Sequence, residues 1–381
     1  MSSQRFRPLI YVTGSSGKTT TKEMIAAVLR TRWRVLKTPG NSNTIRATAN
    51  MAKRVRMDHQ AVVLEVGMAK PWHLRLHCRI MRPNISVITM VGTAHIGNFG
   101  GNARALAWSK SQLIRHMNPT GWAFINNDDP NTRHLAFGAF KGKIISIGID
   151  KPATYRAYDI RYIDQGMVFK VNLKGKPFGF FIPIHGQHMV YNALFALAVG
   201  DLLGFLPENI KRGLSTYRRV GRRLAVYRTN GVRIIDDTCN ANPNATRAAL
   251  EVLINTGKGR NIAVLGNMEE LGQFSAAGHQ LVGTYLAKKP VHLLFTYGDK
   301  AQQIQASAIR AGFKENMTRH FSTKAALSQH LARILKPGDS VLIKGSHNLQ
   351  MYRVVAYLKY VLGSCQKVLN KQTSNGKASR H

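Results

Sequence analysis

Acidic residues are scarce in this chain, and their scarcity dominates its electrostatics. The 381 residues include 18 Asp and Glu against 55 Lys and Arg, which gives a formal net charge of +37 at pH 7. A surface of one sign attracts polyanions and steers anionic substrates. Nucleic acid, nucleotide-linked or polyacidic metabolites and anionic lipid all fit this charge. A general basic bias that only opposes self-association would produce the same composition without any partner.

Cysteines and long apolar runs are also few. Cys78, Cys239 and Cys365 are widely spaced and form no C-x-x-C pair. They therefore indicate neither a disulfide framework nor a zinc site, and they are typical of a reducing cytosol. No stretch approaches the roughly twenty apolar residues of a membrane-spanning helix. The short apolar run near the N-terminus lacks the cleavage site of a signal peptide, so we expect a cytoplasmic protein without a membrane span.

One glycine-rich turn carries clear chemical meaning. An apolar run, Leu9 to Val12, breaks into Thr13-Gly14-Ser15-Ser16-Gly17-Lys18-Thr19-Thr20 and then into a helical pattern. The backbone N–H groups of such a turn, together with the helix N-terminus, bind phosphate oxygens. Lys18 would reach the terminal phosphates and Thr19 would hold Mg²⁺. Val12 replaces the first glycine of the longer phosphate-loop pattern, so only the short form G-x-x-G-K-T is present. A Gly/Ser turn with a solvated lysine is the alternative.

Strand and helix patterns alternate through the first 150 residues. Buried strands are predicted at 9–12, 60–66, 85–91, 122–125 and 144–147. This alternation predicts an α/β fold with a doubly wound parallel sheet, whose ligands lie at the carboxyl ends of the strands. The loop lysine, Glu65 and His95 all fall at such ends. Residues 155–184 change to short alternating strands, which predicts a small antiparallel appendage.

A second series of strands and helices follows the basic segment 217–223 and predicts a second, Rossmann-like α/β domain. We therefore divide the chain into a first domain with the glycine-rich loop at 1–220, a second domain at 221–363 and a basic tail at 364–381. The tail is polar, and we expect it to be disordered.

Several further motifs follow the glycine-rich loop in a fixed order. They are Gly40-Asn41, Leu64-Glu65-Val66-Gly67, Ala94-His95-Ile96, Ser109-Lys110, His188 with Asn192, Gly221-Arg222, Asp236-Asp237-Thr238-Cys239-Asn240-Ala241-Asn242-Pro243, Leu265-Gly266-Asn267-Met268-Glu269-Glu270-Leu271-Gly272 and Lys344-Gly345-Ser346. In this order they resemble the Mur ligase family over nearly the whole chain. The Asp-Asp-x-x-Asn-Ala-Asn-Pro and Met-x-Glu-Leu-Gly stretches are most similar to the branch that adds D-alanyl-D-alanine in peptidoglycan synthesis.

The resemblance implies an ATP-dependent ligase. In such enzymes ATP phosphorylates a carboxylate, an amine attacks the acyl phosphate, and the products are an amide, ADP and phosphate. This chemistry needs positioning and positive charge more than a nucleophile. The cofactors implied are ATP and two Mg²⁺ ions, and the substrates are an anionic carboxylate and an amino acid or dipeptide.

The resemblance also implies roles for particular residues. Catalysis would involve Lys18, Glu65, His95, Lys110 and Arg222. ATP would contact Gly14, Ser15, Ser16, Gly17, Lys18, Thr19, Thr20, Asn41, His188, Asn192, Arg222 and Asp236. The metal ligands would be Thr19, Glu65, His95 and Lys110. The substrates would contact Asp237, Asn240, Asn242 and Lys344.

Lys110 needs a chemical change to serve as a metal ligand. A protonated amine cannot bind Mg²⁺, but relatives carry a CO₂-derived carbamate at this lysine, and a carbamate is chemically a carboxylate. A surface lysine on an amphipathic helix would explain the same pattern. Two other predicted residues have similar alternatives. His188 could be a structural histidine of an apolar helix, and Arg222 could be a solvated arginine of the linker.

The chain also departs from the family pattern. Cys239, Gly97, His347 and Gln112 replace a tyrosine, an acidic residue, an arginine and a glutamate that are usual there. The phosphate loop begins about a dozen residues after Met1, so we expect the family's UDP-gripping N-terminal domain to be missing. A related ligase that acts on a different anionic carboxylate is therefore one alternative. A basic phosphate-loop protein that binds nucleic acid is a less favoured one, and we expect a monomer.

Overall fold

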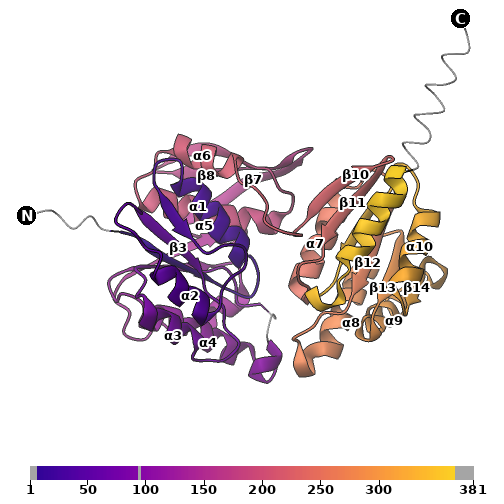
Figure 1. Ribbon diagram of the computed structural model, residues 1–381, viewed down its shortest axis with the longest axis horizontal. Helices are drawn as coiled ribbons and strands as arrows, with labels where there is room; N and C mark the ends of the chain where they lie inside the picture. The colour runs from indigo at the N-terminus through magenta and orange to yellow at the C-terminus, as the bar shows by residue number, and fades with distance from the viewer. Residues whose placement is uncertain (1–6, 93–95, 365–381) are drawn as a thin grey trace, which may run out of the picture. The chain divides into compact units, whose positions relative to one another are not determined.

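The computed structural model describes residues 7–92 and 96–364 of the chain. They divide into two compact units on either side of the Val220–Gly221 bond. Each unit has its own sheet, covering helices and core (Figure 1). The predicted α/β architecture is confirmed in both.

Unit 1 is built on one nine-stranded sheet with the strand order β2-β3-β1-β4-β5-β6-β7-β8-β9. The sheet is parallel from β2 to β7, and Val12 lies opposite Glu65 at its centre. Central strands such as β1 and β3 are buried, which explains their unbroken apolar runs. The strands are β1 (Leu9–Thr13), β2 (Val35–Lys37), β3 (Ala61–Glu65), β4 (Ile85–Ile88), β5 (Trp122–Asn126), β6 (Lys143–Gly148), β7 (Tyr155–Ile163), β8 (Gly166–Leu173) and β9 (Lys176–Ile182).

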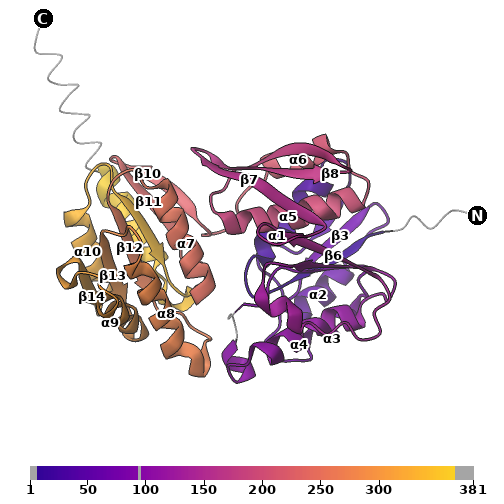
Figure 2. The same ribbon diagram turned by 180° about the vertical axis from the view of Figure 1, so that it is seen from behind.

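Helices cover both faces of this sheet (Figures 1 and 2). One face carries α1 (Lys18–Leu29), α5 (Gln187–Leu202) and α6 (Pro207–Ser215), and the other carries α2 (Ile45–Ala52), α3 (His73–Ile80) and α4 (Ala103–His116). Helix α5 is buried along most of its length, so it shows no polar stripe. None of the described helices is long and apolar enough to cross a bilayer.

The predicted antiparallel appendage is part of the same sheet. Strands β7, β8 and β9 are antiparallel to one another, as the alternating pattern predicted. However, β7 also pairs in parallel with β6, where Ile147 lies opposite Tyr155. The three strands therefore extend the parallel sheet of unit 1 and do not form a separate one.

Unit 2 contains a six-stranded sheet with the order β10-β11-β15-β12-β13-β14. All neighbours are parallel except the edge strand β10, which is antiparallel to β11. The strands are β10 (Ala225–Thr229), β11 (Val232–Asp237), β12 (Asn261–Gly266), β13 (Leu293–Tyr297), β14 (Thr318–Phe321) and β15 (Ser340–Lys344). The helices are α7 (Pro243–Thr256), α8 (Ser275–Ala287), α9 (Gln302–Arg310), α10 (Lys324–Ile334) and the helical residues 352–364.

Several short elements were not predicted from the sequence. Strand β2 has only three residues, and α3 is a helix of eight residues whose buried stripe is short: Leu74, His77 and Cys78. Helix α2 is also short and ends at Ala52. Ser364, the first residue of the predicted tail, continues a helix. The rest of that tail, residues 365–381, lies outside the described residues.

Gly213 marks a close contact between two helices of unit 1. A Cβ atom at Gly213 of α6 would lie 2.4 Å from Val28 Cα and 2.9 Å from Ala27 O in α1. Because both neighbours are backbone atoms, they cannot move without separating the helices.

We expect Gly213→Ala to lower the free energy of unfolding by about 1–3 kcal/mol through overpacking. The matched control is Gly179→Ala in β9, where an added Cβ has open space. Urea unfolding followed by circular dichroism measures both, and equal stabilities of the two variants would contradict the close contact.

Candidate functional site

The glycine-rich loop leaves β1 and enters α1 with two glycines in conformations that L side chains rarely adopt. Gly14 has φ 147°, and a Cβ there would lie 1.9 Å from Thr89 Oγ1. Gly17 has φ 83°, and a Cβ there would lie 2.5 Å from Asn192 Oδ1. Both positions therefore require glycine for conformation and for space. The backbone of the loop is left uncovered by its own side chains, as a phosphate site needs.

Neighbouring strands hold the loop in place. Ser15 N donates to Met90 O at 2.9 Å, and the Thr89 hydroxyl donates to Ser16 O at 2.5 Å. Lys18 Nζ folds back and donates to Gly14 O at 2.8 Å. Gly17, the N-cap of α1, has no side chain to cap the helix, and the N-terminus of a helix favours an anion.

The Glu65 carboxylate lies beside the start of α1. Thr19 Oγ1 donates to Glu65 Oε2 at 2.8 Å, and Asn43 Nδ2 donates to Glu65 Oε1 at 2.9 Å. Glu65 is 1% exposed and its own N–H donates to Thr38 Oγ1 at 3.0 Å. A hydroxyl and a carboxylate at a phosphate loop are hard oxygen ligands of the kind that Mg²⁺ takes, and Mg²⁺ usually completes its shell with water and phosphate. The residues present therefore fit this ion.

Lys22 organises the loop that follows β2, although the sequence motifs assigned it no role. This lysine of α1 is fully buried, and its Nζ donates to Thr38 O at 2.8 Å and Gly40 O at 2.6 Å. Its charge is balanced by Glu23 at 2.8 Å. Lys22 thereby fixes the segment from which Asn43 reaches Glu65. Asn41, the predicted ATP contact in this segment, is exposed.

Lys110 is buried and not a surface lysine. It lies on α4 with 1% exposure, and no described residue hydrogen-bonds to its Nζ. Burial and the nearby Lys18 charge lower the pKa of Lys110 to about 7, while Asp129 opposes this shift. Asp129, to which the sequence motifs assigned no role, accepts the Val91 N–H at 2.5 Å. Burial raises the pKa of its carboxyl.

The remaining predicted residues of unit 1 have mixed outcomes. Asn192 is brought to the loop, since its Oδ1 accepts from Thr21 Oγ1 at 3.0 Å. His188 is half-buried one turn earlier on α5. Ser15, Thr19 and Thr20 are buried around the loop. His95, the predicted second metal ligand, lies outside the described residues.

In unit 2 three predicted residues meet at the ends of two neighbouring strands. Asp237 ends β11 and lies opposite Lys344, which ends β15. Lys344 Nζ pairs with Asp237 Oδ2 at 2.5 Å and donates to Asn240 O at 2.8 Å. Lys344 is 2% exposed, so this ion pair is largely desolvated. Its strength depends on both partners remaining charged.

Asp236 and Arg222 lie in the same unit. The Asp236 carboxylate accepts from Thr238 N at 3.0 Å and Thr238 Oγ1 at 2.6 Å, and burial raises its pKa. The Arg222 guanidinium stacks on the Tyr352 ring at 4.4 Å. Asn242, a predicted substrate contact, caps α7 by accepting the Ala245 N–H at 2.9 Å. That cap accounts for this asparagine structurally.

The Met-Glu-Glu-Leu-Gly loop is tied to the end of β15. Ser346 Oγ accepts the Glu269 N–H at 2.8 Å, and Met268 N donates to His279 Nε2 at 3.0 Å. Glu270 has φ 64°, a left-handed turn. The motif is therefore held beside Lys344 by backbone contacts.

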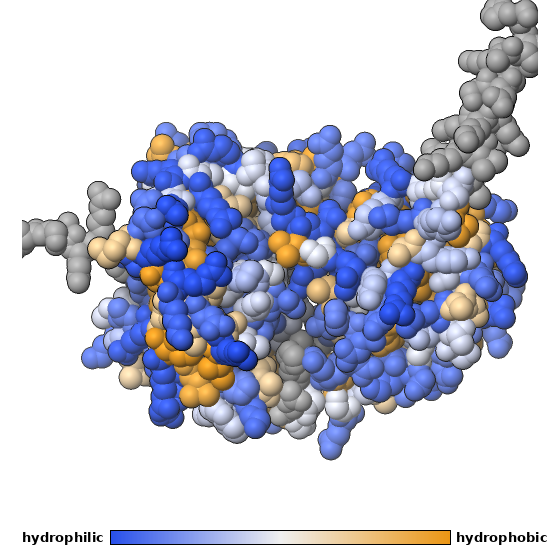
Figure 3. Space-filling view, viewed as in Figure 1, coloured by the Kyte–Doolittle hydropathy of each residue, from blue (hydrophilic) through white to orange (hydrophobic). Residues whose placement is uncertain are grey.

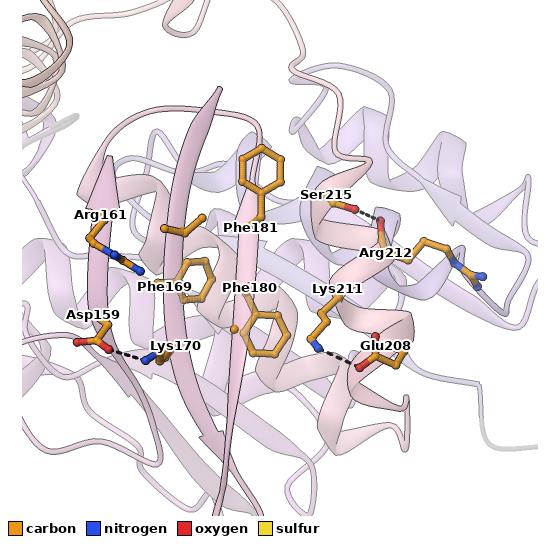
Figure 4. A pocket seen from close by; sticks show the side chains of 12 residues that line it. Asp159, Arg161, Phe169, Lys170, Phe180, Phe181, Glu208, Lys211, Arg212 and Ser215 are labelled. Carbon is orange, nitrogen blue, oxygen red and sulfur yellow. Dashed lines mark hydrogen bonds and ion pairs between the residues drawn. The ribbon is translucent and has the colours of Figure 1, made fainter. Parts of the chain in front are cut away.

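A groove of about 540 Å³ lies elsewhere in unit 1, between β7–β9 and α6 (Figure 4). Its apolar floor includes Phe180 and Phe181, and its rim carries the ion pairs Asp159–Lys170 at 2.8 Å and Glu208–Lys211 at 2.9 Å. It shares no residue with the phosphate loop. It is therefore not the candidate site.

Comparisons with known proteins find one matching family model in each of the two units. The Mur ligase middle domain matches residues 12–200, and the Mur ligase glutamate ligase domain matches residues 222–347. The UDP-N-acetylmuramoyl-tripeptide–D-alanyl-D-alanine ligase of Bacillus subtilis is 32% identical over 91% of this chain and 75% of its own. The ligase of the same name from Synechocystis is 33% identical over 93% of this chain and 75% of its own.

Solved structures are similar as well. MurF from Acinetobacter baumannii superposes with a TM-score of 0.85 and 31% identity, covering 92% of this chain and 76% of that one. MurF from Thermotoga maritima in complex with ADP has a TM-score of 0.83 and 25% identity, covering 94% and 81%.

The geometry of Gly14 leads to a test of the phosphate loop. We expect Gly14→Ala to weaken ATP binding by at least about tenfold, because the new Cβ would displace Thr89 and the loop amides. Gly175→Ala in a hairpin is the control, since it also has positive φ but open space. Calorimetric titration with ATP measures both, and an unchanged dissociation constant for Gly14→Ala would contradict the site.

Proposed function

Because the chain belongs to the Mur ligase family of ATP-dependent ligases that form amide bonds, we propose that it joins D-alanyl-D-alanine to a UDP-linked muramoyl tripeptide. The observation that carries the chemistry is the Thr19–Glu65 pair at 2.8 Å beside a phosphate loop. Similarity over 91% of the chain to curated enzymes of that activity supports the substrates.

The loop would bind and orient the phosphates of ATP. Gly14 and Gly17 leave the backbone accessible, and Lys18 can exchange its bond to Gly14 O for phosphate oxygens. These donors are fixed before the reaction, so they stabilise the charge that spreads over the transferred phosphoryl group.

Thr19 and Glu65 would hold Mg²⁺, which neutralises phosphate charge when bound. Asn43 fixes the second oxygen of Glu65, so the carboxylate cannot rotate away from the loop. Lys22 fixes the segment that carries Asn43. Orientation of a metal ligand by such neighbours is a common requirement for affinity.

Unit 2 would contribute the groups that bind the incoming dipeptide and the nucleotide. Lys344 would bind the carboxylate of the dipeptide, with Asp237 and Asn240 fixing the Lys344 ammonium group. Arg222 and Asp236 would face the nucleotide. Asn242 would contact the substrate at the N-terminus of α7, which its side chain also caps.

The direct test is amide formation. With ATP, Mg²⁺, UDP-muramoyl tripeptide and D-alanyl-D-alanine, we expect ADP release together with the ligated amide product. We expect Glu65→Gln to lower kcat at least about 100-fold, because the amide cannot supply the charge that the metal needs. Glu208→Gln, an exposed carboxylate on α6, is the matched control and should retain activity.

Two results would contradict parts of this proposal. Amide formation only with other anionic carboxylates would remove the muramoyl acceptor and keep the ligase. ATP turnover that yields no amide with any carboxylate and amine would remove both.

Lys110 is proposed to carry a carbamate. A neutral amine attacks CO₂ to give the carbamate and one proton, and burial favours the neutral amine because it lowers the pKa to about 7. Below that pKa the protonated amine is unreactive, so we expect carbamate formation to increase from about pH 6 to about pH 8. The nearby Lys18 cation would then be balanced by the new anion.

We expect Lys110→Ala to lose most activity and to regain part of it with added short carboxylates such as acetate, which can occupy the place of the carbamate. Carbon-13 bicarbonate NMR of the unmodified chain should show a carbamate signal that Lys110→Ala lacks. Lys211→Ala, at a half-exposed lysine of α6, is the control. A missing signal, or a fully active Lys110→Ala, would contradict the carbamate.

A further inference from the structure

Helices α3 and α4 present the same two kinds of side chain to solvent. On α4 the exposed side chains include Arg104, Trp108 and Arg115, which are spaced by four and seven residues and so share one helix face. Along α3 and its N-cap they are Trp72, Arg75 and Arg79. We call these six residues the arginine–tryptophan face. The two helices pack side by side on one side of the sheet (Figures 1 and 2).

The segment that forms this face contains no acidic residue that could neutralise its arginines. Residues 66–127 include no Asp or Glu, but they include the basic residues Lys70, Arg75, Arg79, Arg82, Arg104, Lys110 and Arg115. The arginines of the two helices are close to one another. The pKa of His116, at the end of α4, is lowered by burial and then by the charges of four surrounding arginines: Arg75, Arg115, Arg79 and Arg82. Such a cluster is repulsive until an anion neutralises it.

Large rings accompany these charges. Trp72 is 52% exposed and Trp108 is 49% exposed, and Lys70 Nζ lies 5.4 Å from the Trp72 ring centre. Half-exposed tryptophan beside arginine is typical of side chains that sit at the boundary between lipid headgroups and acyl chains.

The neighbouring helix adds an apolar group of a different kind. Helix α2 packs on α3, and just beyond its end Met57 is 95% exposed, next to the exposed Arg54 and Arg56. Figure 3 shows apolar residues gathered among hydrophilic ones in the lower part of unit 1, where α2 and α3 lie. A methionine side chain gains by insertion into lipid but offers no planar face for stacking on a base.

We propose that the arginine–tryptophan face, with Met57, binds the surface of an anionic phospholipid bilayer. Arginines would pair with lipid phosphates, while Trp72, Trp108 and Met57 enter the boundary layer. The positive charge of this face requires a partner with an anionic surface. Met57 favours lipid over nucleic acid, because its side chain can insert into lipid but cannot stack on a base. The chain would bind peripherally, with its helices lying in the plane of the interface.

Co-sedimentation of the full chain with vesicles tests this proposal. One set is phosphatidylcholine alone, and the other contains about one third phosphatidylglycerol. We expect binding to the anionic set, a drop of at least about tenfold in the partition coefficient for Arg75→Gln/Arg79→Gln/Arg115→Gln, and a smaller drop for Trp72→Ser/Trp108→Ser. Tryptophan fluorescence should shift to the blue on binding, and this shift should be lost in the tryptophan variant.

The matched control removes the same charge from unit 2. Arg310→Gln/Lys314→Gln/Arg333→Gln replaces three exposed basic residues and should change the partition coefficient less than about twofold. Circular dichroism and ADP release confirm that each variant is folded, since none of these residues belongs to the ligase site. Equal losses in both triple variants, no vesicle binding by the unaltered chain, or loss of single-stranded oligonucleotide binding in place of vesicle binding would each overturn the proposal.

Discussion

The hydrogen bond from the Thr19 hydroxyl to the Glu65 carboxylate joins the two parts of unit 1 on which the rest of the site depends. Thr19 lies in the first turn of α1, and Glu65 ends a buried central strand. A carboxylate with 1% exposure is costly unless its oxygens are paired, and here a hydroxyl and an amide pair both. The chain therefore places a desolvated negative charge beside a turn built to attract negative phosphates. A divalent cation held between them, as proposed for Mg²⁺, would resolve that conflict.

Much of the fold and site could be predicted from the sequence because the informative residues obey local rules. The glycine loop, the strand ending in Glu65 and the Asp236–Asp237 stretch lie where their patterns indicated, and the family resemblance and α/β architecture are confirmed. Local rules work there because a buried parallel strand requires an apolar run and a loop with positive φ requires glycine.

Other features depend on contacts between distant segments, which periodicity does not encode. Asn43 and Lys22 have no distinctive motif, yet together they fix Glu65 through bonds across the loop after β2. The burial of Lys110 depends on how α4 packs, so the sequence alone could not decide between a buried and a surface lysine. Asn242 matched a family motif, but its local geometry is a helix cap. Family motifs thus indicate the position of a site, whereas the contacts of each residue determine its physical role.

Asn192 has a consequence for how the chain acquires its nucleotide site during synthesis. The loop emerges from the ribosome before α5, but the Gly17 backbone and the Thr21 hydroxyl in the first turn of α1 rest against Asn192, which lies 171 residues after Thr21 on a buried helix. Until α5 docks beside α1, the turn lacks the wall that selects its left-handed geometry. We therefore expect a nascent chain to bind a nucleotide at this loop only after α5 has left the ribosome.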